Sequence, residues 1–239
     1  YRALTRATDA VDSVSQDTNS LTQARGTVQY AGDTMDVSFD SSTREKIVLR
    51  NGKVQLSSET KITQNGETTE SGTWIKDGWL YLYTKDGGVT AKNKVAVDDS
   101  MTDADLAEVE SNQVDKVGLS AIKSISVVKD GLTSYYSVDV DASAAAFLSG
   151  ILENYVDEDD KDLTSIEVSD IKVTYTVNGQ DVLGAMTTSF RLKIVYASGE
   201  FQGDPMVMDM KYTVASNILA TGNAVSITFP DFSDYVILN

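Results

Sequence analysis

The feature that most constrains this chain is a two-residue alternation of apolar and polar side chains, broken by short turn signals. From residue 25 onward apolar side chains recur at every second position, as in Met35, Val37 and Phe39. This spacing places side chains on one face of a strand, and strands joined by tight turns pair antiparallel. The turn signals are Ala31-Gly32-Asp33, Ser41-Ser42-Thr43, Asn51-Gly52, Asn65-Gly66, Asp77-Gly78, Asp86-Gly87-Gly88 and Asp130-Gly131. The sequence therefore predicts a mostly β fold built around an antiparallel sheet.

Two segments show helical spacing instead. From about residue 2 to 22 apolar side chains recur at alternating intervals of three and four, which predicts a helix lying on the sheet as a half-buried lid. A second helix is predicted in mid-chain, with Asp141 or Ser143 as its cap. Its apolar stripe consists of Phe147, Leu148, Ile151, Leu152 and Tyr155. Between residues 98 and 122 the pattern fits either a short helix, capped by Thr102 and Asp105, or an acidic loop.

The second half of the chain returns to strand spacing. At least four strands are predicted after residue 163, the last of them through Val225, Ile227 and Phe229. At 239 residues with 41% hydrophobic side chains, the chain is long enough for one large β domain. We predict a single domain over 1–239. The order of helix and strands repeats in pseudo-halves 1–120 and 121–239, without a residue-by-residue repeat.

Charge and missing residue types exclude several functions. The chain has 20 Lys and Arg against 36 Asp and Glu, a formal charge of −16, which repels nucleic acid and anionic membrane surfaces. It has no His and no Cys, so the usual general base, thiol nucleophile and soft metal ligands are absent. No nucleophile-elbow motif or phosphate-binding glycine loop occurs. We predict a protein that is not an enzyme and needs no cofactor.

The location of the protein is predicted from two weaker signs. No apolar run is long enough to span a membrane. The sequence begins with Tyr1 rather than Met, which suggests that a leader has been removed. We expect an extracytoplasmic monomer at the cell surface or anchored to a membrane.

The sharpest local pattern is the stretch 205–212. Strict alternation sends Met206, Met208, Met210 and Tyr212 to one face and the charged residues between them to the other. Unbranched thioethers adapt to ligands of variable shape, so this stripe, with Phe190, would suit an acyl chain. The alternative is that these methionines only fill the core.

An aromatic group surrounds the Asp77-Gly78 turn. It comprises Trp74, Trp79, Tyr81 and Tyr83. Such a group can serve as a platform for a sugar ring or as the lip of a lipid cavity, and Trp79 and Tyr81 are included among the candidate ligand-binding residues. Cross-strand aromatic pairing explains the same pattern without a ligand.

Acidic stretches offer hard oxygen ligands. The stretch 157–162 contains five Asp and Glu residues, but it fits no register of the helix–loop–helix calcium template. The group around Asp98, Asp99, Asp103 and Asp105 is equally unspecific. We predict solvated loops without a metal.

Two strings resemble uncharacterised LolA/LprG-like lipoproteins of Gram-positive bacteria. They are Thr73-Trp74-Ile75-Lys76-Asp77-Gly78-Trp79-Leu80-Tyr81-Leu82-Tyr83 and Val225-Ser226-Ile227-Thr228-Phe229-Pro230-Asp231-Phe232. The resemblance covers nearly the whole chain. It implies a curved, half-open β-barrel covered by helices, which holds lipid on its concave side, and a tether through an N-terminal lipidated Cys outside these residues.

The resulting hypothesis is an extracytoplasmic lipoprotein domain that binds a lipid or another hydrophobic ligand in the concave side of its sheet. The alternative is a cell-surface module with a solidly packed interior that binds a protein or glycan. A hydrolase that uses two carboxylates comes third and would require two acids facing each other in a cleft.

Overall fold

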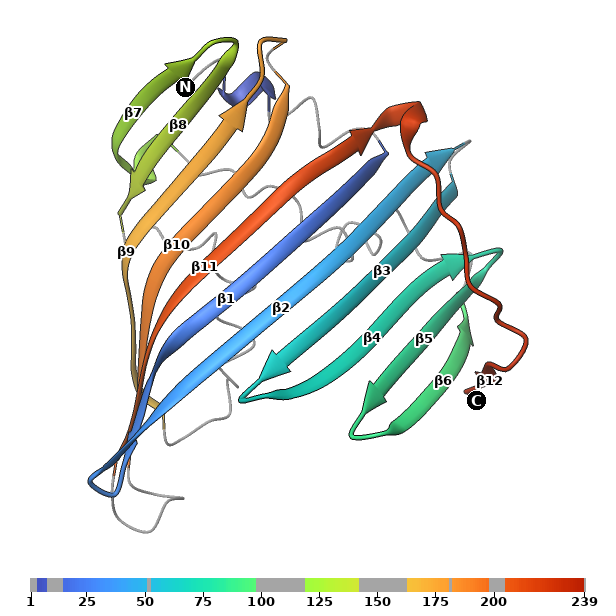
Figure 1. The fold of residues 1–239 in the computed structure, drawn as a ribbon, viewed down its shortest axis with the longest axis horizontal. Coiled ribbons are helices and arrows are strands. Elements are labelled where there is room, and N and C mark those ends of the chain that lie inside the picture. Colours follow the sequence, from blue (N-terminus) through green and yellow to red (C-terminus); the bar gives the residue numbers. More distant parts are fainter. Residues whose placement is uncertain are drawn as a thin grey trace.

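The computed structural model describes residues 4–7, 15–50, 53–97, 119–141, 163–180, 182–197 and 205–238. The described strands form one twisted, open sheet of twelve strands (Figure 1). The order across the sheet is β12, β6, β5, β4, β3, β2, β1, β11, β10, β9, β8, β7. All neighbouring pairs run antiparallel except β12 and β6, which are parallel. The prediction of a mostly antiparallel β fold is confirmed.

The strands are long, and the longest meet at the middle of the sheet. Their bounds are β1 (Gln16–Tyr30), β2 (Asp33–Arg50), β3 (Lys53–Gln64), β4 (Glu67–Lys76), β5 (Trp79–Asp86), β6 (Val89–Ala96), β7 (Ile122–Asp130), β8 (Thr133–Val140), β9 (Leu163–Val177), β10 (Leu183–Tyr196), β11 (Met206–Thr221) and β12 (Val236–Ile237). Two short 3-10 helices are η1 (Leu119–Ala121) and η3 (Gly222–Ala224). A single helical turn occupies residues 4–7.

Two-residue hairpin turns lie where the sequence predicts them. Asn65 and Asp77 have φ angles of 50° and 52°, and the glycine that follows each also has a positive φ. Two successive left-handed residues match the right-handed twist of the paired strands, which is why Asn-Gly and Asp-Gly occur here. The predicted turn at 51–52 lies outside the described residues.

The turn predicted at residues 41–43 is wrong, because β2 runs straight through it. These polar residues pair with β1 on one side and β3 on the other. The hydroxyls of Thr43 and Thr60 lie 2.9 Å apart and share a hydrogen bond. Serine and threonine are stable within a strand when neighbouring strands provide hydrogen-bond partners for their backbone and hydroxyl groups. Local composition does not reveal those neighbours.

The predicted N-terminal helix over 2–22 is also wrong at its C-terminal end. Residues 4–7 are helical, but β1 begins at Gln16. Thr18 and Leu21, assigned to one helical face, point to opposite faces of the sheet, and Leu21 is exposed. The polar, partly β-branched run 16–22 favours a strand once β2 and β11 flank it. The mid-chain helix and the segment 98–118 lie outside the described residues.

One face of the sheet, here called the apolar face, holds the main core. In register across the sheet stand Phe39, Ala24, Tyr212 and Phe190. Ala24, Tyr212 and Phe190 are buried, and Leu4 and Ala7 of the N-terminal turn join the same cluster. A smaller cluster, of Ile47, Leu56 and Ile75, lies on the same face where β2, β3 and β4 are neighbours.

The opposite face is here called the strap face, and the alternation along β2 shows which residues lie on it. Phe39 and Lys46 are an odd number of positions apart, so they point to opposite faces. In register with Lys46 stand Ser57, Trp74 and Tyr81. These residues therefore lie on the strap face.

Residues 222–238, here called the strap, cross the sheet after β11 (Figure 1). The strap begins where Gly222 N–H donates to the carbonyl of Ser15, and Lys46 Nζ donates to the carbonyl of Ser226. It ends as β12, paired with β6 at the sheet edge. The predicted closing strand through Val225 and Phe229 is wrong. The alternating residues are extended, but no described strand pairs with them, and they pack across the sheet instead.

Candidate functional site

The strap is fixed to the sheet by an aromatic cluster. The ring of Phe232 stacks on Tyr81 with centroids 3.8 Å apart and planes 13° apart. Tyr235 meets Trp74 edge-on at 6.5 Å. Phe229 joins at the rim, where Lys76 Nζ lies 5.3 Å from its ring centroid. Such aromatic pairs add to the burial of apolar area, so the side chains of the strap help to hold it on the sheet between its two hydrogen-bonded ends.

A pocket of about 480 Å³ lies beside this cluster on the strap face. Its aromatic residues are Trp74 and Tyr83 from the sheet and Tyr235 from the strap. Pro230 and Asp231 form the strap side of the wall. The volume falls within the range of about 300 to 1,000 Å³ that is usual for small-molecule sites.

The pocket has a balanced set of charges. Six charged side chains line it: Arg44, Lys61, Lys92, Glu59, Glu70 and Asp231. Three are cations and three are anions, whereas the whole chain carries −16. The pocket therefore differs in charge from the rest of the molecule, because basic residues are concentrated in it.

Most of these charges have partners. Arg44 donates two hydrogen bonds to Asp17, at 2.7 and 2.8 Å, and Lys92 donates to Asp234 at 2.6 Å. These bonds raise the pKa of Arg44 and of Lys92 above their ordinary values. Both side chains therefore stay charged at any physiological pH.

The strap side of the pocket is held in the same way. The backbone N–H and the hydroxyl of Ser233 both donate to Asp231 and lower the pKa of its carboxyl group. Burial raises the pKa of Tyr235, so its hydroxyl stays neutral. Lys61 has no hydrogen-bond or ion-pair partner among the described residues.

Gly72 lies next to the pocket, beneath the indole of Trp74. It stands opposite Glu59 and Tyr83 in the register, and a Cβ placed on it would lie 2.2 Å from Cη2 of Trp74. The indole therefore lies over the space that a side chain at position 72 would fill. Trp74 is only 5% exposed, and within the described part of the chain its Nε1–H has no acceptor. A buried donor without a partner is uncommon.

The predicted Met stripe lies on the other face. Met206, Met208, Met210 and Tyr212 all point to the apolar face, as the alternation predicts, and Phe190 lies beside them. The rings of Phe190 and Tyr212 stack with centroids 5.0 Å apart and planes 5° apart. The structure therefore brings these five residues together.

Trp79 and Tyr81 are not brought to the Met stripe. Both lie on the strap face, where Lys94 Nζ is 5.4 Å from the ring centroid of Trp79 and Phe232 covers Tyr81. The sequence-predicted ligand-binding residues thus divide into two groups on opposite sides of one sheet. They do not line a single concavity.

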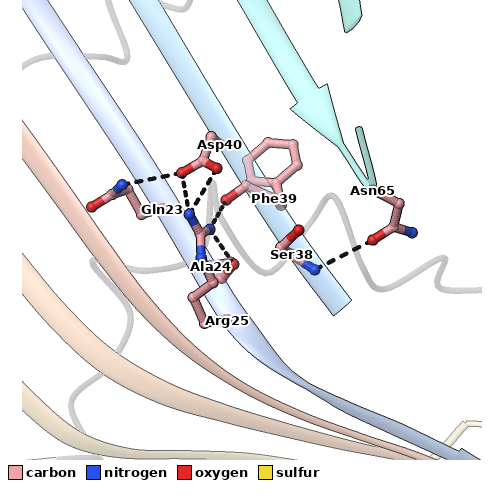
Figure 2. Close-up of polar contacts among 7 residues, drawn as sticks. All are labelled: Gln23, Ala24, Arg25, Ser38, Phe39, Asp40 and Asn65. Carbon is pink, nitrogen blue, oxygen red and sulfur yellow. Dashed lines mark hydrogen bonds and ion pairs between the residues drawn. The ribbon is translucent and has the colours of Figure 1, made fainter. Parts of the chain in front are cut away.

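Beyond the pocket the strap face is a polar surface with paired charges. Figure 2 shows Arg25 of β1 reaching Asp40 of β2, with both guanidinium–carboxylate distances at 2.7 Å. Gln23 also donates to Asp40, and Arg25 donates to the carbonyl of Phe39. Arg191 and Asp209 form a second pair at 2.7 and 2.5 Å. A depression of about 520 Å³ lies between these pairs.

The two acidic stretches are the remaining candidates from the sequence. The acidic stretches at 98–105 and 157–162 lie outside the described residues. Within the described ranges, no group of three or more Asp or Glu is placed to hold a metal ion. In the same ranges, no helix has the length and apolarity required to cross a membrane.

Sequence reasoning missed most of the pocket. Trp74 and Tyr83 were part of the aromatic group that it identified, but Tyr235, Lys61 and Gly72 were not singled out. A glycine within a strand is a recognisable sign of close approach by another group. Gly72 in the stretch 67–73 carried that signal.

Comparisons with known proteins add little. No family model matches the chain, and no curated protein matches it. A crystal structure of a DUF1329 family protein from Desulfovibrio piger ATCC 29098 is similar over 98% of this chain and 95% of that chain, with a TM-score of 0.24 and 14% identity. A similarity of this size carries no conclusion. The LolA/LprG-like resemblance of the sequence stays a prediction.

Proposed function

We propose that this protein is an extracytoplasmic lipoprotein domain that holds a lipid or another hydrophobic ligand against the apolar face of its sheet. The observation that supports it is a row of apolar side chains that leads from the core to solvent. In register across four strands stand Met35, Val28, Met208 and Ile194. Ile194 is fully buried, Val28 and Met208 are half-buried, and Met35 is 56% exposed.

A continuous apolar row of this kind suits a flexible hydrocarbon chain. Methionine side chains adapt their shape, so Met35 and Met208 can accommodate different acyl chains at the same position. Met206 and Tyr196, which are paired beside this row, are also half-buried. The ligand would extend the core outward rather than replace any part of it.

The inner part of the Met stripe has a different role. Met210 is buried, and its Sδ would lie 2.8 Å from a Cβ placed on Gly26. Its thioether therefore fills the space that Gly26 leaves, and together with the stacked Phe190 and Tyr212 it forms packed core. This packing favours the alternative, a surface module for a protein or glycan without a lipid. The proposed lipid site is accordingly the outer row alone.

The proposal includes binding without catalysis, a monomeric state, and attachment to a membrane only through a lipid anchor, as the LolA/LprG-like resemblance implies. The charge of −16 supports the last point, because such a chain is repelled by anionic lipid surfaces.

Native mass spectrometry of protein purified without denaturant, followed by organic extraction, tests the proposal. A stoichiometric apolar adduct is expected in the wild type and is expected to disappear from a Met35→Glu, Met208→Gln double variant. The matched control is Leu132→Glu, which introduces the same charge at an apolar residue that is 83% exposed and remote from the row. A bare wild-type mass that stays bare after incubation with mixed phospholipid vesicles would support the alternative.

A further inference from the structure

The pocket beside the strap is separated from the apolar row by the thickness of the sheet, so it is a second site. We propose that it binds a neutral saccharide. Its walls are aromatic on two sides, with the half-buried Tyr83 on the sheet and Tyr235 on the strap. The face of an aromatic ring carries partial negative charge and packs well against the C–H groups of a sugar ring.

The charges of the pocket favour a neutral ligand that carries many hydroxyl groups. The pocket contains three cations and three anions. Its carboxylates repel an anionic ligand, and its ammonium and guanidinium groups repel a cationic ligand. A purely apolar ligand would remove Lys61, Glu59 and Glu70 from water without giving them hydrogen-bond partners, which is costly. Each hydroxyl of a saccharide both donates and accepts, so it satisfies carboxylate and ammonium groups alike.

Three side chains of the pocket have hydrogen-bonding capacity left for such hydroxyls. Lys61 has no partner among the described residues. Glu59 faces Arg44 across the register, but the guanidinium of Arg44 donates to Asp17. Among the described residues, Glu70 has only a long ion pair, 3.9 Å, with Lys85. One donor and two acceptors therefore line the same pocket.

Trp74 supplies an independent sign of a ligand. Its indole N–H is a donor only, it is buried, and within the described part of the chain it lacks an acceptor. Trp74 also lines the pocket. The N–H itself is covered by neighbouring side chains, so a saccharide hydroxyl or ring oxygen accepts from it only when the strap shifts.

Isothermal titration calorimetry on the whole chain tests this site. The probes are neutral mono- and disaccharides, including maltose, cellobiose and N,N′-diacetylchitobiose, with glycylglycine and inorganic phosphate as competing classes. One-to-one binding of at least one saccharide is expected. The Tyr83→Ala variant is expected to bind that saccharide about tenfold more weakly, which corresponds to about 1.4 kcal/mol.

Two further variants keep the result interpretable. Lys61→Met removes the unpaired donor without disturbing an ion pair and is expected to weaken binding in the same direction. Tyr135→Ala is the matched control, because it removes the same side chain from an exposed position on β8 (38% exposed), and it should bind as the wild type does.

The saccharide proposal is overturned if no neutral saccharide gives heat at millimolar concentration. It is also overturned if only glycylglycine or phosphate binds, or if saccharide affinity is equal in the wild type and in Tyr83→Ala and Lys61→Met. Loss of the lipid adduct in the experiment on the apolar row leaves this result unaffected, since the two sites share no residue.

Discussion

Both faces of the sheet hold stacked aromatic rings, buried on the apolar face and half-buried on the strap face, but they connect those rings to the protein differently. On the apolar face, Phe190 and Tyr212 belong to neighbouring strands that are hydrogen-bonded along most of their length. On the strap face, Tyr81 is stacked by Phe232, which belongs to a segment joined to the sheet edge through two residues of β12. The first contact is part of the cooperative core, whereas we expect the second to open in local unfolding of the strap.

The glycines of the two faces differ in the same sense. A Cβ on Gly26 would lie 2.0 Å from the backbone oxygen of Asp209 in the neighbouring strand. The three heavy atoms nearest to a Cβ on Gly72 all belong to the side chain of Trp74. Backbone within a sheet moves only if the strands separate, while a ring under the strap is able to shift. The packed core of the apolar face is therefore rigid, and the strap face is more adaptable.

The largest expected effect is the loss of the buried ring on the apolar face. Phe190→Ala should lower the free energy of unfolding by about 3 to 5 kcal/mol, because it leaves a cavity in a close-packed core. Denaturant titration monitored by far-UV circular dichroism measures it. Tyr135→Ala is again the control and should change the value little. A loss below about 1 kcal/mol would show that Phe190 lies in a yielding environment and that the two faces are alike.

The next effect compares the two glycines directly. Gly26→Ala should cost about 3 kcal/mol, the upper end for overpacking, because it pushes on the backbone of β11. Gly72→Ala should cost about 1 kcal/mol and should change the near-UV circular dichroism of Trp74. Equal losses of unfolding free energy in both variants would contradict the contrast between a rigid and an adaptable face.

A smaller and more local effect is expected for the strap. Phe232→Ala should lower stability by about 2 kcal/mol at most, since the ring is only half-buried. Hydrogen exchange should show faster exchange for the backbone N–H groups of Tyr235 and Leu238, with unchanged protection of β10 and β11. Faster exchange throughout the sheet would mean that the strap belongs to the cooperative core.

The smallest effect concerns the charge pair of β10 and β11. The hydrogen bond from Arg191 lowers the pKa of Asp209, so the pair stabilises the fold above the unfolded-state pKa of about 3.9 and loses this contribution as the pH falls through the lower folded-state pKa. Asp209→Asn should be slightly less stable than the wild type near neutral pH, and the difference should vanish in acid and shrink in high salt. Unfolding measured for both proteins over this pH range checks it, and a difference that grows toward acid would reverse the sign assigned here.

Much of the fold follows from local patterns in the sequence. The alternation in 206–212 placed the Met residues on one face, and the Asn-Gly and Asp-Gly pairs located two hairpins, because both depend only on side-chain direction and on the φ angles that neighbouring residues tolerate. The start of β1 at Gln16 and the continuity of β2 through residues 41–43 were not predictable in this way. Both depend on the strands alongside, which satisfy the polar groups of Ser, Thr and Asn.

The candidate sites show the same division. The sequence by itself determined which side chains share a strand face, so the Met stripe and the Trp79–Tyr81 pair were each identified correctly as groups. Only the tertiary structure decided that these groups lie on opposite faces, because the relative orientation of two distant strands depends on the whole register between them. It also brought Tyr235 and Asp231 beside Trp74, since the strap crosses the sheet through side-chain packing that no local sequence period records.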